Sequence, residues 1–150
     1  MDSSLWNLLH DGSIERVDGS VPGDVSLLVS IGYLRNRFPG EGTGFVVLLS
    51  GCTHFTFHPY DEPVLSDLAA IAALEPEILS AKAGDPLEIC CVMGTLSVRY
   101  KSCALSLDNG PPVALSELDA ASEAYWREWS ERSRAAPNNS FKPKPLRGSA

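Results

Sequence analysis

The sequence predicts an α+β domain in which β-structure dominates. We expect an antiparallel sheet or sandwich of about six or seven strands, with a short central helix and a C-terminal helix packed on it. Two observations predict this class. Apolar and polar residues alternate along much of residues 13–108, which is the period of half-buried strands. Helix-forming residues gather near position 70 and again after position 115.

The first two predicted strands form a hairpin. They are "SIERVDG" and "DVSLLVSIGYL", and the second alternates from Val25 to Tyr33 with Leu28 as its one exception. The stretch "VPGD" between them is typical of a short turn. The preceding segment, "SLWNLLHDG", allows two interpretations, a short helical turn or an irregular strand.

A long apolar run follows the turn-rich loop "RNRFPGEGTG". The run "FVVLLSGCTHFTFH" exceeds an average strand unless it bends, and Gly51 is the predicted bend or bulge. Strand alternation divides the side chains into two faces. The predicted core face holds Val47, Leu49, Phe55 and Phe57, and the predicted outward face holds Cys52, His54, Thr56 and His58.

The central segment predicts a short helix at about residues 67–74, with Ser66 or Asp67 as its cap, because Pro76 excludes an unbroken helix beyond it. Residues 77–83 allow a strand or a second short helix. "LEICCVM", "TLSVRYK" and "CALSLD" predict three further strands. The alternation shifts by one residue near Lys101 and Ser102, which predicts a bulge or a tight reversal there.

The C-terminal segment "SELDAASEAYWREWSERSRAA" predicts a helix with Ser116 as its N-cap and Asp119 completing a capping box. Its apolar stripe is expected to dock on the sheet, with Trp129 in the core. Trp126 lies at the edge of that stripe. Since an exposed tryptophan on an acidic helix favours an interface, Trp126 is a candidate binding residue. The stripe consists of Leu118, Ala121, Ser122, Tyr125 and Trp129.

We expect one globular domain at residues 1–136 and a disordered tail at residues 137–150. The tail, "PNNSFKPKPLRGSA", has three prolines and one aromatic residue, too little apolar surface to offset the entropy of ordering. It resembles a C-terminal extension of the type "NNSFKP.PLRG" that recurs on otherwise unrelated small bacterial proteins and looks like translation into a dispersed repeat. That resemblance implies a bacterial origin and implies nothing about function.

Charge argues for a protein partner. The chain carries a formal charge of −7, and residues 1–136 hold 9 basic against 19 acidic side chains. Such a surface repels phosphate backbones, so we predict no nucleic-acid binding, and it favours a basic protein partner. Asp2 stands where a signal peptide needs a basic residue, and no apolar stretch approaches a membrane span. We therefore predict a cytoplasmic protein that does not bind membranes.

The cysteines predict reduced thiols, buried at Cys90 and Cys91, rather than disulfides. Cys90 and Cys91 are adjacent and lie in an apolar run, which does not suit a disulfide framework or a redox site. The two others are Cys52 and Cys103.

Residues 51–62, "GCTHFTFHPYDE", invite a metal site because cysteine, histidine and carboxylate crowd together. Distance argues against it, since His54 and His58 are about 13 Å apart along a strand. An ordinary polar strand face is the favoured interpretation, and we predict no metal site and no cofactor. Motifs for phosphate binding or nucleophilic catalysis are missing, so no catalytic residue is assigned. His54, His58 and Asp61 remain the polar candidates for a binding site.

The order of the segments "HDGSIERV", "DVSLLVSIGYL", "FVVLLSGCTHFTF", "EILSAK" and "LEICCVMGTLSVRY" resembles small, mostly uncharacterised bacterial β-rich domains with an N-terminal "HDG" turn. Those domains have a reputation as toxin-immunity proteins, so the resemblance implies an inhibitor. The predicted function is a non-enzymatic acidic binding protein of immunity type with a basic protein partner. The alternative is a small enzyme or ligand-binding domain with a pocket near His54, His58 and Asp61.

Overall fold

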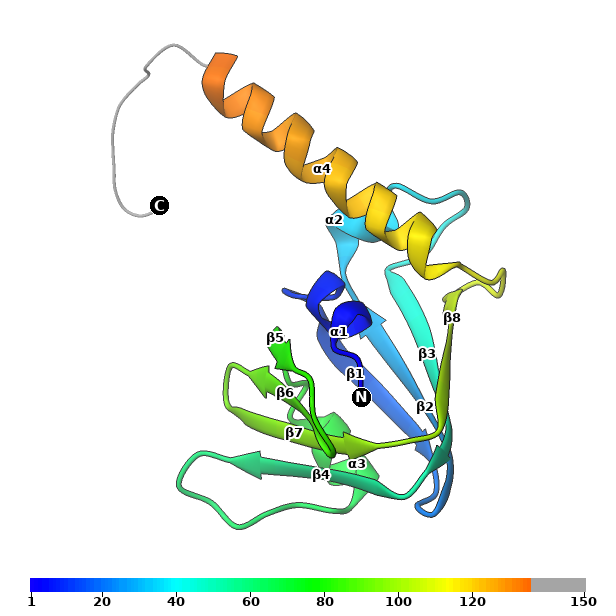
Figure 1. Cartoon of the computed structure of the whole chain (residues 1–150), viewed down its shortest axis with the longest axis vertical. Helices are drawn as coiled ribbons and strands as arrows, with labels where there is room; N and C mark the ends of the chain where they lie inside the picture. The colour runs from blue at the N-terminus through cyan, green and yellow to red at the C-terminus, as the bar shows by residue number, and fades with distance from the viewer. Residues whose placement is uncertain (136–150) are drawn as a thin grey trace.

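A computed structural model describes residues 1–135 and shows two four-stranded antiparallel sheets (Figure 1). The α+β class with β dominant is confirmed, with eight strands in place of six or seven. The predicted tail lies outside the described residues. The first sheet has the order β1 (Ser13–Gly19), β2 (Gly23–Ser30), β3 (Gly44–Cys52), β8 (Ser102–Leu107). The second has the order β4 (His54–Pro59), β7 (Gly94–Arg99), β6 (Leu87–Cys91), β5 (Ile78–Lys82).

Four helices accompany the sheets. They are α1 (Ser4–Leu8), α2 (Gly32–Arg35), α3 (Leu68–Ala73) and α4 (Leu115–Ala135). The predicted central helix is α3. The two open alternatives are resolved, since the N-terminal segment forms a helix and residues 78–82 form a strand. The predicted second strand stops at Ser30, before its expected end. Ile31 and Leu34 are both buried and three residues apart, so one helical turn keeps both in the core.

Two corners carry the chain from one sheet to the other. Gly51 has a φ of 63°, and the chain bends there from β3 into β4. This conformation favours glycine, and a Cβ at this position would lie 2.9 Å from the Lys101 side chain. The bend predicted at Gly51 is therefore confirmed. The second corner lies beside it, since the Lys101 N–H donates to the Ser50 carbonyl over 2.9 Å.

These corners correct two sequence predictions. The shift in alternation near Lys101 comes from the crossing between β7 in the second sheet and β8 in the first, and not from a bulge or a reversal within one sheet. Cys52 was predicted to face outward but is fully buried. It follows the bend at Gly51, where the alternation of β3 ends, and its side chain faces the core together with Leu49 and Phe55.

Helix α4 begins earlier and packs differently than predicted. Glu117 accepts a hydrogen bond from the Ala114 N–H at 2.8 Å, so Ala114 occupies the cap position and Ser116 lies within the first turn. The main contacts of α4 are with α1 and α2 rather than with the face of a sheet. Its C-terminal half projects from the rest of the molecule (Figure 1).

Candidate interaction face on helix α4

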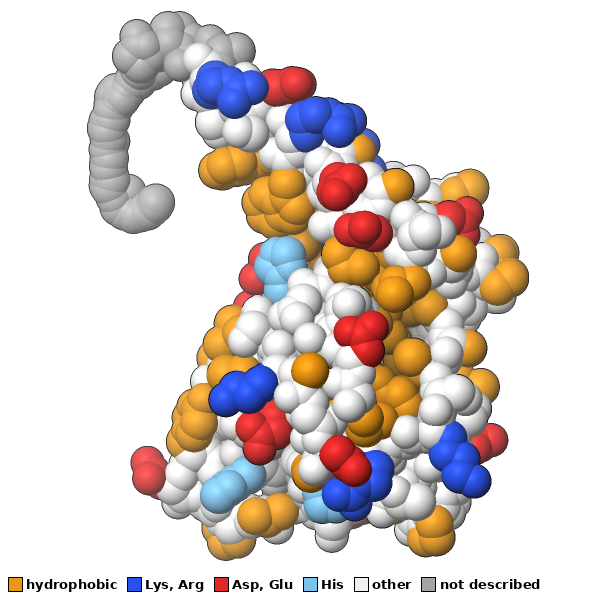
Figure 2. All heavy atoms as spheres, viewed as in Figure 1, with side chains coloured by type: hydrophobic (Ala, Val, Ile, Leu, Met, Phe, Trp, Pro, Cys, Tyr) orange, Lys and Arg blue, Asp and Glu red, His pale blue; other side chains and the backbone are white. Residues whose placement is uncertain are grey.

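The apolar stripe of α4 continues past the point where the body of the protein ends. Leu118 is fully buried and Ser122 is 7% exposed. One and two turns later, on the same side of the helix, Trp126 is 36% exposed and Trp129 is 49% exposed. Figure 2 shows hydrophobic side chains on the underside of the projecting helix. The prediction that Trp129 belongs to the core is therefore wrong, because no described segment lies opposite that part of the stripe.

These tryptophans belong to a cluster of five rings, which we call the aromatic face. His10 stacks on Trp126 with ring centroids 5.8 Å apart, and Trp126 lies 5.9 Å from Trp129. Tyr33 and Tyr125 approach to 4.4 Å, and each also contacts Trp126. Three segments therefore meet here: the residue that follows the α1 turn, helix α2 and helix α4.

Polar contacts hold the aromatic face in place. Arg37 forms an ion pair with Glu128 through both terminal guanidinium nitrogens, and its guanidinium carbon lies 5.8 Å from the ring centroid of Tyr125. The Tyr33 hydroxyl donates to the His10 carbonyl over 3.3 Å. Burial, reinforced by the nearby charge of Asp11, raises the pKa of Tyr33 to about 12, so this hydroxyl keeps its proton at neutral pH.

The arrangement suits recognition of another protein. Tryptophan and tyrosine are enriched at interfaces, where rigid rings supply large contact area for little conformational entropy. Rings that already pack on one another lose even less freedom on binding. Asp11 and Glu123 are exposed beside the rings, and they give this part of the face an acidic border.

The structure separates the sequence candidates. His54 and His58 lie on β4, and Asp61 follows in a turn with a φ of 63°. The His54 ring lies 3.3 Å from the Thr56 hydroxyl, whereas His58 and Asp61 are exposed. Trp126 belongs to α4, at the opposite end of the molecule (Figure 1). Among residues 1–135, no group of three or more histidine, cysteine and acidic side chains could hold a metal ion. A binding role for His54, His58 and Asp61 stays a prediction.

The four cysteines are free, but only some are buried. Cys52 and Cys91 are buried, Cys90 is half-buried and Cys103 is exposed, so the burial predicted for Cys90 and Cys91 is complete only at Cys91. Burial raises the pKa of Cys91 to about 12, with a smaller contribution from Cys90, and burial also raises the pKa of Cys52 and Cys103. These shifts favour the neutral thiol, the less reactive form.

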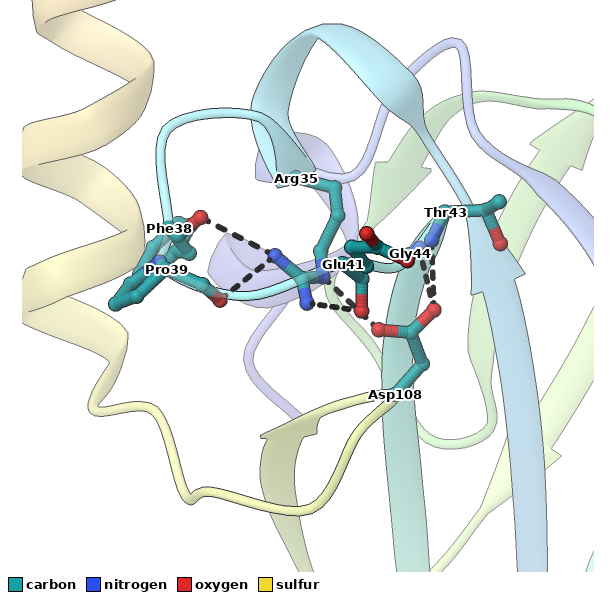
Figure 3. A network of polar contacts seen from close by, with 7 residues as sticks. All are labelled: Arg35, Phe38, Pro39, Glu41, Thr43, Gly44 and Asp108. Atoms are coloured by element: carbon teal, nitrogen blue, oxygen red, sulfur yellow. Dashed lines mark hydrogen bonds and ion pairs between the residues drawn. The ribbon is translucent and has the colours of Figure 1, made fainter.

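A buried ion pair that the sequence did not reveal links α2 to the residue that follows β8 (Figure 3). The Arg35 side chain is 1% exposed, and its Nε donates to Asp108 Oδ1 over 2.9 Å. Its two other nitrogens donate to the carbonyls of Phe38, Pro39 and Glu41 at 3.1–3.3 Å. Arg35 therefore fixes the loop between α2 and β3.

Asp108 completes this network. Its Oδ2 accepts the backbone N–H groups of Thr43 and Gly44 at 2.7 and 3.2 Å. Burial by itself would raise the pKa of Asp108, but the hydrogen bonds from Arg35, Thr43 and Gly44 outweigh it, and the pKa is lowered. Since both carboxylate oxygens and all three guanidinium nitrogens are already bonded within the protein, the network stabilises the loop.

Comparisons with protein-family models, with curated proteins and with solved structures found no match to this chain. Within residues 1–135, no helix combines the length and the apolar character needed to cross a membrane.

Proposed function

We propose that this protein is a non-enzymatic binding domain that engages a basic protein partner through the aromatic face. The observation that carries the proposal is the exposure of Trp126 and Trp129 on a stripe whose earlier members are buried. Exposed apolar side chains are unfavourable in water. A partner that covers this stripe would remove two large rings from water, which favours binding.

Charge supports a basic partner. The excess of acidic side chains across residues 1–136 steers a basic surface toward the domain over a distance of about one Debye length, roughly 8–10 Å. Close to the rings, Asp11 and Glu123 supply local carboxylates, while Glu128 is already paired with Arg37. In its finer form the proposal is an immunity-type inhibitor whose acidic surface masks a basic toxin, in line with the resemblance of the strand order.

A capture experiment tests the proposal. Full-length protein serves as bait in a bacterial extract, beside the double variant Trp126→Ala/Trp129→Ala. We expect wild type to retain one stoichiometric basic protein and the double variant to lose most of it. Raising the salt from about 0.05 M to about 0.5 M should weaken the capture, because screening shortens the range of the acidic field.

The matched control is Leu79→Ala, which removes another exposed hydrophobic side chain on β5, in the second sheet. It should leave the capture unchanged. Equal recovery of the partner by wild type and the double variant would contradict the proposed interface, and a partner of acidic composition would contradict the charge argument.

A further inference from the structure

Other segments of the same chain form hydrogen bonds with part of the backbone at the edges of the two sheets. The edge strands are β1 and β8 in the first sheet and β4 and β5 in the second. On β1, the Ile14 N–H donates to the Pro76 carbonyl over 2.9 Å. On β4, Phe57 exchanges two hydrogen bonds with Leu65. On β5, the Asn7 side chain bonds both backbone groups of Ala81. Such cover protects an edge from pairing with other chains.

The edge of β8 is covered over only half of its length. The Leu107 N–H donates to the Pro111 carbonyl over 2.8 Å, and the Val113 N–H donates to the Leu105 carbonyl over 2.9 Å. Residues 111–113 thus run antiparallel to β8 as a short added strand. After Val113 the chain turns away into α4, and within residues 1–135 no strand or bridge pairs with Ser102–Ala104 on this side.

Cys103 is the centre of this open edge. Its backbone groups point outward like those of Leu105 and Leu107, because alternate residues of an edge strand point their N–H and C=O the same way. Its side chain also shares their inward face, yet Leu105 and Leu107 are buried whereas Cys103 is exposed. The side chain of Cys103 therefore lies on the core face of the sheet by alternation but is exposed to solvent. Ser102, Cys103 and Ala104 include none of the charged or proline residues that usually protect an edge.

An apolar groove lies beside the open edge. Leu115, at the start of α4, lines two adjoining hollows. One, of about 250 Å³, is lined by Leu5, Tyr100 and Cys103 among others. The other, of about 480 Å³, lies between α1 and α4 and includes Leu8. Figure 2 shows a hydrophobic floor in this hollow between the N-terminal segment and β8.

We propose that an extended segment of a partner protein adds to β8 at Ser102–Ala104 and continues the antiparallel pairing begun by residues 111–113. The N–H and C=O of Cys103 would bond the backbone of that segment, and alternate apolar side chains would fill the groove between Leu5 and Leu115. Strand addition of this type gains affinity from main-chain hydrogen bonds and specificity from the side-chain pockets. The site is separate from the aromatic face and does not depend on it.

The occupant is a single extended segment rather than the edge of a second copy. The N-terminal segment and the start of α4 wall the groove that lies beside the open edge (Figure 2). A second copy would bring its whole sheet and its own residues 111–113 against these walls, whereas one extended chain fits between them. The residues that already cover the other half of β8 are themselves an extended segment with an apolar side chain, Val113, turned into the core.

The test uses the full-length protein and the synthetic peptide Lys-Thr-Val-Thr-Val-Thr-Lys. Its control has the same composition without alternation, Lys-Thr-Thr-Val-Val-Thr-Lys. We expect the alternating peptide at millimolar concentration to slow hydrogen exchange at the Cys103 amide and to slow alkylation of the Cys103 thiol by iodoacetamide several-fold. Cys90, in the second sheet, is the internal reference and should keep its rate of alkylation.

Two variants complete the test. Leu115→Asp places a charge in the groove at an exposed helix position and should weaken peptide binding at least about ten-fold. Leu79→Asp, at an exposed position of β5, should leave binding unchanged. Equal protection by both peptides, no protection of Cys103, equal binding by Leu115→Asp, or protein dimerisation through this edge would each overturn the proposal.

Discussion

The Arg35–Asp108 network and the aromatic face are built on the same helical turn and differ in almost every other respect. Arg35 and Tyr33 both belong to α2. Arg35 is 1% exposed and all its nitrogens have partners, whereas the face to which Tyr33 contributes leaves Trp129 49% exposed. One side of a single turn thus satisfies its polar groups completely, and the other side leaves apolar groups uncovered.

This difference separates stability from binding. A buried charge that loses its partner is costly, so the network has to stay intact for the loop of residues 36–43 to keep its shape. An exposed ring costs little to remove, because most of its surface is already in water or at the rim of the cluster. Substitutions in the first region should therefore destabilise the fold, while substitutions in the second should leave it folded and unable to bind.

The largest expected effect comes from Arg35→Met. The change leaves the Asp108 carboxylate and three carbonyls without their donor, and breaking a buried pair in this way costs about 3–5 kcal/mol. Urea denaturation measures the free energy of unfolding. Arg37→Met is the matched control, since its ion pair with Glu128 is partly exposed and screened by water, and its loss should destabilise the protein much less. Equal losses in the two variants would remove the distinction between the regions.

Asp108→Asn should have a smaller effect that depends on pH. The pKa of Asp108 is lower in the folded protein than in the unfolded chain, so its contribution to stability is complete above the unfolded pKa of about 3.9 and is lost as the pH falls through the folded pKa. We expect the variant to lose about 1.5–3 kcal/mol at neutral pH, as for hydrogen bonds to a charged group. Urea denaturation at neutral pH and near pH 3 should show the gap from wild type narrowing in acid. A constant gap would contradict the assignment.

The strands were predictable because alternation is a local signal. Phe55 and Phe57 face the core as expected, and so do Val25, Leu27 and Val29. The same rule failed at Cys52, because the bend at Gly51 interrupts the alternation and leaves the next side chain in the core. A single sequence does not show that Gly51 marks a crossing between sheets rather than a bulge. The shift in alternation near Lys101 was visible in the sequence, but its cause, the crossing from β7 in the second sheet to β8 in the first, was not.

The candidate site was predictable only at Trp126. The helical stripe shows which side chains share a face of α4, but it does not show where the opposing surface ends, so Trp129 was placed in the core. His10 and Tyr33 join the cluster from segments about 90 or more residues away, and no spacing in the sequence links them to Trp126. Arg35 gave no signal either, because its carboxylate partner lies 73 residues further along the chain.

The smallest expected effect on stability comes from removing an exposed ring of the aromatic face. Trp129→Ala removes a ring that is half exposed and contacts Trp126 at its rim, so the free energy of unfolding should fall by no more than about 1 kcal/mol. Leu118→Ala, about three turns earlier on the same stripe, removes a fully buried side chain and should cost about 2–5 kcal/mol. Urea denaturation of the two variants measures this difference directly. If Trp129→Ala were as destabilising as Leu118→Ala, the ring would be part of the core in solution. That result would contradict the proposal that the aromatic face is an exposed binding surface.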